Sequence, residues 1–131
     1  MHSSFMSQLK FDPSSLSIIV TADIKATFPT AAKLILDTGA SYVALPYDLV
    51  SRIGIPIDPK NTVRLTSIST VETISKIIIP EMRVLGKKVK NVEAIVKDLP
   101  PETPADGLLG LSFLKNFKLT IDFKKGLLEL T

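Results

Sequence analysis

The sequence predicts a single all-β domain of the barrel or sandwich type, and three observations support this fold class. The chain has 131 residues, a length at which one hydrophobic core is enough for one domain. Its apolar residues come in short runs rich in Val, Ile and Thr, which favour strands. Turn residues separate these runs at the spacing typical of all-β proteins, and no long helical period interrupts them.

The chain divides into an N-terminal lead-in and a domain. Residues 1–14 are polar, have no sustained period and end in a turn-forming cluster around Pro13. We therefore expect a flexible lead-in over residues 1–14 and the domain over residues 15–131. Within the domain, the β-rich runs predict strands at 16–24, 32–37, 42–45, 62–66, 71–79, 82–85, 89–96, 118–123 and 127–130.

Two short helices are expected between the strands. The first begins at Pro46 and ends at Gly54, because proline is favoured in the first turn of a helix and glycine just after the last turn. The second covers residues 112–116 and follows a proline-rich loop at residues 98–104. The fold class therefore remains all-β, with one or two short helices.

The composition excludes several kinds of chemistry. The chain has no Cys, and its only His is His2, near the N-terminus. A disulfide framework, a thiolate metal site and a Ser-His-Asp triad are therefore excluded. We expect a protein that uses neither a metal nor a cofactor.

Charge and hydropathy predict that the protein binds no nucleic acid and does not insert into a membrane. The net charge is +3, and Lys and Arg are scattered among acidic residues. The densest basic run, residues 83–90, contains Gly86 between two strand-like segments, so a solvated hairpin tip explains it better than a nucleic-acid patch. No apolar run approaches the ~20 residues that span a bilayer, and no signal peptide is recognisable. We therefore expect a soluble, cytoplasmic protein.

The stretch Leu-Ile-Leu-Asp-Thr-Gly-Ala-Ser at residues 34–41 contains the chemically informative residues. Its three aliphatic residues predict a strand buried on both faces, and a carboxylate at the end of such a strand needs hydrogen bonds or a shared site. Thr38 places a hydroxyl beside Asp37, and Gly39 allows its N–H to approach the carboxylate because no Cβ intrudes. An Asx-turn at a strand end is the alternative explanation of the same residues.

A second motif strengthens the functional interpretation. Gly-Leu-Leu-Gly at residues 107–110 is followed by Ser-Phe-Leu, and Tyr-Val-Ala-Leu-Pro at residues 42–46 follows the Asp-Thr-Gly stretch. In their order and separation, these motifs resemble those of the retropepsin-like aspartic proteases, the single-domain family that includes the retroviral proteases. The resemblance covers about residues 16–130. It implies a small closed β-barrel in which the Asp loop and the apolar-apolar-Gly segment cross beneath the active site.

The resemblance also implies roles for individual residues. Asp37 would be the catalytic aspartate, Thr38 would grip the partner loop, and Gly39 with Ala40 would form the floor beside the scissile bond. Ser41, where retroviral enzymes usually have an acid, would contact substrate. Members of the family activate water between two aspartates, and this chain has one Asp-Thr-Gly. The resemblance therefore implies a homodimer that cleaves polypeptides.

A flap that closes over substrate is expected at residues 64–72, with the substrate-contacting residues Ser67, Ile68 and Ser69 at its tip. Flap tips of the family usually carry Gly, and this chain has none between Gly54 and Gly86. A plain surface hairpin is the alternative.

The apolar strand at residues 127–130 would leave an exposed edge, so we expect it to pair across the dimer axis. For Asp106, next to the second motif, a bond to the Asp37 loop and a turn cap are both possible.

These inferences combine into one functional hypothesis, a homodimeric aspartic endopeptidase with Asp37 as its catalytic residue. A catalytically silent dimerisation or peptide-binding module with the same fold is the alternative. A metal-free glycosidase is a third possibility, and it would require a second acid about 5–10 Å from Asp37 in the same protomer.

Overall fold

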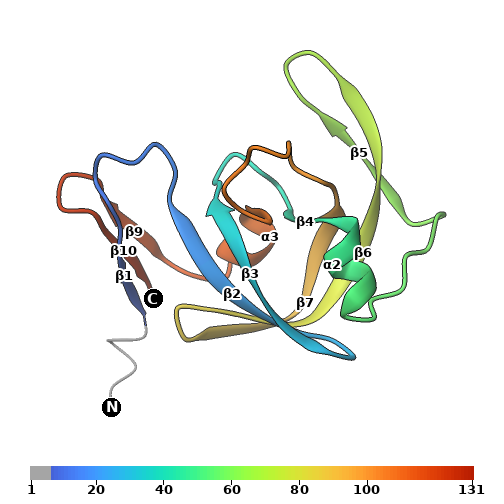
Figure 1. The fold of residues 1–131 in the computed structure, drawn as a ribbon, viewed down its shortest axis with the longest axis horizontal. Coiled ribbons are helices and arrows are strands. Elements are labelled where there is room, and N and C mark those ends of the chain that lie inside the picture. Colours follow the sequence, from blue (N-terminus) through green and yellow to red (C-terminus); the bar gives the residue numbers. More distant parts are fainter. Residues whose placement is uncertain (1–6) are drawn as a thin grey trace.

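Six strands form a closed ring in this computed structural model, which describes residues 7–131. Neighbouring strands in the ring are hydrogen-bonded, and β6 closes it by pairing with β2 (Figure 1). In order around the ring, the strands are β2 (Ile19–Lys25), β3 (Pro29–Leu36), β8 (Gly107–Leu109), β4 (Val43–Leu45), β7 (Lys87–Val96) and β6 (Val71–Val84). The closed all-β barrel that the family resemblance implied is therefore confirmed.

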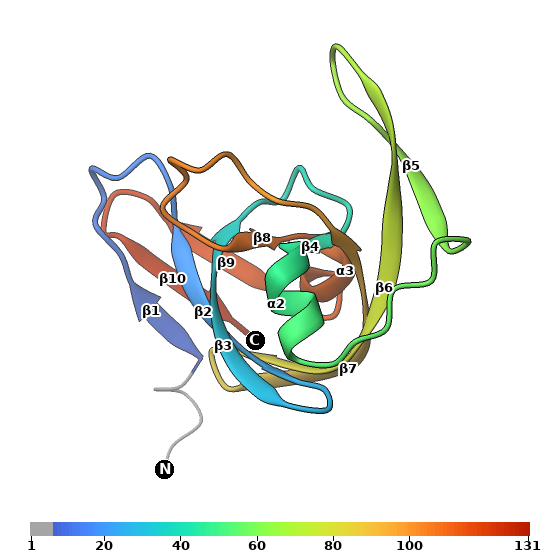
Figure 2. The same ribbon diagram turned by 45° about the vertical axis from the view of Figure 1, so that its right-hand side comes forward.

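Four further strands and two short helices complete the fold. β5 (Thr62–Thr66) pairs with the first part of β6, and this hairpin projects from the ring (Figure 2). A separate three-stranded sheet, in the order β1-β10-β9, lies beside the barrel. Its strands are β1 (Gln8–Lys10), β9 (Leu119–Asp122) and β10 (Leu127–Leu130), and the helices are α2 (Tyr47–Arg52) and α3 (Leu111–Leu114).

One hydrophobic core joins the barrel, both helices and the small sheet. Buried and exposed residues alternate along β2, as expected of a strand with one face on the core. Phe113 of α3 is the largest fully buried side chain. Leu128 and Leu130 of β10 belong to the same buried cluster, so the terminal sheet is an integral part of the domain.

The N-terminal segment differs from expectation. Residues 8–10, which we expected to lie in a flexible lead-in over 1–14, form β1 and pair with residues 127–129 of β10. That part of the expectation is wrong, because a short polar strand at a sheet edge carries no hydrophobic pattern of its own. Residues 1–6 lie outside the described residues.

The terminal strand also differs from expectation. β10 pairs with β1 on one edge and with β9 on the other, so it has no free edge inside the described chain. The apolar residues Leu128 and Leu130 are buried within the protomer. A pairing of β10 with a second copy is therefore not needed to cover it.

β6 runs unbroken through Pro80, where the sequence predicted two strands. The ladder with β7 skips one position there, since Ile79 pairs with Val92 and Glu81 with Lys90. Asn91, which falls in the gap, has a φ of 57°. Pro80 lacks an N–H to donate, and this irregularity in the ladder accommodates it.

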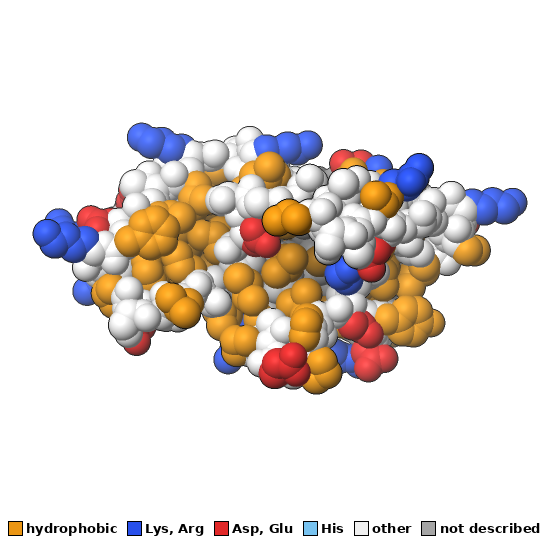
Figure 3. All heavy atoms as spheres, turned by 90° about the horizontal axis from the view of Figure 1, so that it is seen from above, with side chains coloured by type: hydrophobic (Ala, Val, Ile, Leu, Met, Phe, Trp, Pro, Cys, Tyr) orange, Lys and Arg blue, Asp and Glu red, His pale blue; other side chains and the backbone are white. Residues whose placement is uncertain are grey.

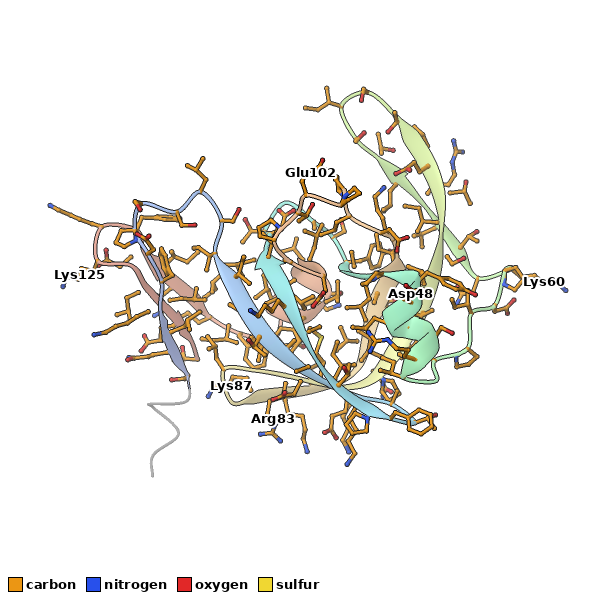
Figure 4. All side chains as sticks on the ribbon, in the orientation of Figure 1. Asp48, Lys60, Arg83, Lys87, Glu102 and Lys125 are labelled. Carbon is orange, nitrogen blue, oxygen red and sulfur yellow. The ribbon has the colours of Figure 1, made fainter. Side chains whose placement is uncertain are left out.

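The basic run at residues 83–90 is a hairpin tip, as predicted. Val84 pairs with Lys87, and the two residues between them, Leu85 and Gly86, both have positive φ, which is the conformation of a tight I′-type turn. Lys60, Arg83 and Lys125 point away from the barrel on three different sides (Figure 4). Within residues 7–131, no helix is long and apolar enough to cross a membrane.

The close approach of β8 to β4 supplies a test of the fold. A Cβ at Gly107 would collide with the backbone carbonyl oxygen of Ala44, whereas a Cβ at Gly39 would meet only Asp37 Oδ1, at 3.2 Å. We predict that Gly107→Ala lowers the free energy of unfolding by about 3 kcal/mol or more, because neither backbone can move aside. Gly39→Ala, the matched control, should lower it by less than about 1 kcal/mol. Urea denaturation measures the free energy of unfolding of both variants. Equal losses of stability in the two variants would contradict the close approach of β8 to β4.

Candidate active site

The loop after β3 holds Asp37 through its own backbone. The Asp37 N–H donates to the carbonyl oxygen of Leu109 at 3.0 Å, and the Ala40 N–H donates to the Asp37 carbonyl at 3.2 Å. The Gly39 N–H donates to Asp37 Oδ1 at 2.9 Å, as the sequence predicted, and this is also the hydrogen bond of the Asx-turn given as the alternative. Among residues 7–131, none donates a hydrogen bond to the other carboxylate oxygen. The half-buried carboxylate is thus oriented by one oxygen and available through the other.

This loop crosses the segment that connects β8 to α3. The Leu111 N–H donates to the Ala40 carbonyl at 2.8 Å, and the Ser112 N–H donates to the Ser41 carbonyl at 2.9 Å. At Gly110 the two backbones approach so closely that a Cβ would lie 2.7 Å from the Ala40 carbonyl oxygen. The glycines of the second motif are therefore required by the approach of another chain segment.

Ser112 is a positioning residue that sequence reasoning missed. Its buried hydroxyl donates to the Glu93 carbonyl at 2.6 Å and accepts from the Val43 N–H at 2.9 Å. It therefore joins α3 to both β4 and β7. The sequence feature that could have identified Ser112 is its single hydroxyl inside the apolar run Leu-Ser-Phe-Leu. A buried hydroxyl requires hydrogen-bond partners.

A cavity of about 240 Å³ lies between the Asp37 loop and the β5–β6 hairpin. Its wall includes Gly39, Ala40 and Ser41 from the loop and Ser67 from the hairpin. A small apolar cluster lies beneath it, with Ala44, Ile74 and Ile95 buried and with Tyr42, Val63, Leu65 and Leu108 packed against them. The structure thus brings four of the predicted site residues to one cavity; their roles stay predictions.

The hairpin at the expected flap position closes without glycine. The Ser67 N–H donates to the Thr70 carbonyl at 2.8 Å, and the two side-chain hydroxyls lie 2.9 Å apart. Positive φ does not occur at residues 67–70, so the missing glycine is not needed for this turn. Ile68 and Ser69 are exposed at the tip and do not line the cavity.

Thr38 faces a different surface from its neighbours Gly39 and Ala40. It lines a second, mainly apolar cavity of about 210 Å³ together with Ile18, Leu36 and Ile121. The surface around this cavity carries Leu16, which is 103% exposed, and Phe123, which is 67% exposed. Seen from above, one group of hydrophobic side chains lies in the left-hand half of the molecule, and others are spread across the middle and the right (Figure 3).

Two close ion pairs connect β6 with β7 and with the residue that follows β7. Lys76 Nζ lies 2.6 Å from Glu93 Oε1, and Lys97 Nζ lies 2.6 Å from Glu72 Oε2. The hydrogen bond to Glu93 raises the pKa of Lys76, and the same bond lowers the pKa of Glu93. Glu72 and Lys97 belong to the cavity wall. Sequence reasoning missed both, because nothing in the local sequence indicates that they meet.

Asp106 joins the start of β8 to β3. Its Oδ2 accepts from the Lys33 N–H at 2.8 Å, and its own N–H donates to the Lys33 carbonyl at 2.7 Å. Within residues 7–131, Asp106 therefore makes neither the bond to the Asp37 loop nor the local turn cap that the sequence left open.

Comparisons with known proteins agree with this geometry. The family model described as "Aspartyl protease" matches residues 20–113. The crystal structure of a retropepsin-like aspartic protease from Rickettsia conorii is similar in fold, with a TM-score of 0.66 and 24% sequence identity over 94% of this chain and 87% of that chain. Comparison with curated proteins gives no match. The match to the Rickettsia conorii enzyme shows that the fold is retropepsin-like. Because the family model spans more than half of the chain, the chain belongs to the aspartyl protease family that this model describes.

Proposed function

We propose that this protein is an aspartic endopeptidase in which two Asp37 carboxylates, one from each chain of a homodimer, activate a water molecule. The main support is the geometry of Asp37 at the backbone crossing, with one oxygen held by the Gly39 N–H and the other without a hydrogen bond from residues 7–131. Membership of the aspartyl protease family supports the same chemistry.

The reaction needs one proton shared between the two carboxylates. Like charges in close proximity cannot both ionise, so the pair keeps a proton at neutral or mildly acidic pH. The ionised carboxylate accepts a proton from water as the water oxygen attacks the peptide carbonyl carbon, while the protonated carboxylate donates to the carbonyl oxygen. Neither role belongs permanently to one chain, and the pair titrates as a unit.

The apolar surface beside Thr38 supports the homodimer. The chain contains one Asp-Thr-Gly, so a second aspartate in the same context requires a second copy. Leu16 and Phe123 are exposed next to the cavity that Thr38 lines, and exposed apolar clusters of this kind mark interaction surfaces. A second copy related by a two-fold axis would cover these side chains and bring the two Asp37 loops together.

The cavity under the hairpin supports a polypeptide substrate. It is open, has apolar residues beneath it and is bordered by the residues that follow Asp37, as expected of a site for a substrate side chain. The catalytically silent module is not favoured. Its main support was the glycine-free flap, and the hydroxyl contacts of Ser67 and Thr70 close that turn without glycine.

We predict that Asp37→Asn keeps the fold and lowers peptide cleavage at least about a hundredfold, because the amide cannot act as the general base. Wild type and Asp37→Asn are compared by their cleavage of denatured protein, and thermal unfolding checks that Asp37→Asn is folded. Turnover by Asp37→Asn at the wild-type rate would contradict the mechanism.

The activity of wild type should follow a bell-shaped pH profile and should be unaffected by a chelator. A loss of activity with EDTA that added divalent metal restores would also contradict the mechanism.

We predict that Phe123→Lys converts the dimer into an inactive monomer while Asp37 is untouched, because a charge would be buried in the proposed interface. Phe28→Lys is the matched control, since Phe28 is 58% exposed and lies in the β2–β3 turn. Sedimentation velocity beside a cleavage assay separates the two variants. A Phe123→Lys protein that remains an active dimer would place the interface elsewhere. A truncation of β10 is a poorer test, because it removes Leu128 and Leu130 from the core.

A further inference from the structure

The ion pair between Glu72 and Lys97 stands in the wall of the cavity beside the Asp37 loop. Glu72 lies on β6, just beyond the turn of the hairpin, and Lys97 directly follows β7. Their side chains are 51% and 36% exposed, and Lys97 Nζ lies 2.6 Å from Glu72 Oε2. A substrate side chain that enters this cavity therefore meets both charges.

The backbone explains why Glu72 and Lys97 meet in the wall of the cavity. The ladder between β6 and β7 begins at Lys76 and Ile95. Beyond this point, the Lys97 N–H donates to the Leu45 carbonyl at 2.9 Å, so the end of β7 follows β4 while β6 continues into the projecting hairpin. Glu72 and Lys97 reach across the space that opens between the two strands.

The lining of the cavity combines this pair with apolar surface. Leu65, Ile95 and Leu108 contribute the apolar part, which suits the stem of a side chain. An acidic side chain placed there would be attracted by the Lys97 ammonium and repelled by the Glu72 carboxylate, and a basic one would meet the reverse. The repulsion offsets the attraction in each case, so a charged side chain gains little from the intact ion pair. A purely apolar side chain would desolvate the ion pair and offer it no hydrogen bond.

A carboxamide is complementary to both partners at once. Its carbonyl oxygen accepts from an ammonium, which has three donors, and its NH₂ group donates to a carboxylate, which has about four acceptor sites. Both groups keep capacity for such bonds while they remain paired with each other, and both bonds are charge-assisted. We propose that Glu72 and Lys97 make this subsite selective for substrates with Gln or Asn at the position that fills it. This inference rests on the proposed peptidase function.

The experiment profiles cleavage of an unbiased peptide library by mass spectrometry, with Asp37→Asn as the control for background proteolysis. Wild type should cleave peptides with Gln or Asn at one position about tenfold better than those with Glu or Lys there. Glu72→Gln leaves Lys97 unpaired, so the preference at that position should shift about tenfold toward Glu. Lys97→Met leaves Glu72 unpaired, so the preference at that position should shift about tenfold toward Lys and Arg.

The second ion pair on the same strands provides the matched control. Glu93 pairs with Lys76 at 2.6 Å and is not part of the cavity wall, so Glu93→Gln should leave the preference unchanged. If cleavage depends on Asp37 but the preference is the same in wild type, Glu72→Gln and Lys97→Met, the subsite assignment alone is overturned. If no cleavage depends on Asp37, the peptidase proposal fails, and the subsite assignment fails with it.

Discussion

The crossing of the Asp37 loop with the segment that leads from β8 into α3 is the constraint on which the rest of the structure depends. Gly110 lets the two backbones approach more closely than any side chain would allow, and Gly107 does the same for β8 against Ala44 of β4. Hydrogen bonds from Asp37, Leu111 and Ser112 then fasten the two segments together. Because these are backbone contacts between β3, β8 and α3, the position of Asp37 is set by the barrel itself rather than by a mobile loop.

The crossing also directs neighbouring residues to different surfaces. Thr38 lines the apolar cavity near Leu16 and Phe123, whereas Gly39, Ala40 and Ser41 line the cavity under the hairpin. A single short loop therefore borders both the surface proposed for the second copy and the surface proposed for substrate. Under the proposed function, each protomer presents half of a site. The Glu72–Lys97 pair lies at the cavity proposed for substrate, whereas Leu16 and Phe123 border the other cavity.

Much of the fold was predictable because its signals are local. A run rich in Val, Ile and Thr identified β2, the Pro46 and Gly54 signals identified α2, and the Asp-Thr-Gly stretch predicted the bond between Gly39 and the carboxylate. Features that depend on distant partners were missed. β1 is recognisable only once β10 lies beside it, and β6 passes Pro80 at a point where the ladder skips a pair opposite Asn91. The glycine-free flap turn was predicted to be a difficulty, yet the hydroxyls of Ser67 and Thr70 close it.

The central claim is that catalysis needs Asp37 from two chains, and mixed dimers test it most directly. Wild-type and Asp37→Asn chains are combined in varied ratios at constant total concentration, denatured together and refolded so that subunits assort at random. If both carboxylates are required, activity falls with the square of the wild-type fraction, and an equal mixture retains about a quarter of the wild-type activity. An equal mixture that retains about half of the activity, as expected if each chain acts independently, or about three quarters, as expected if one Asp37 per dimer suffices, would contradict the claim.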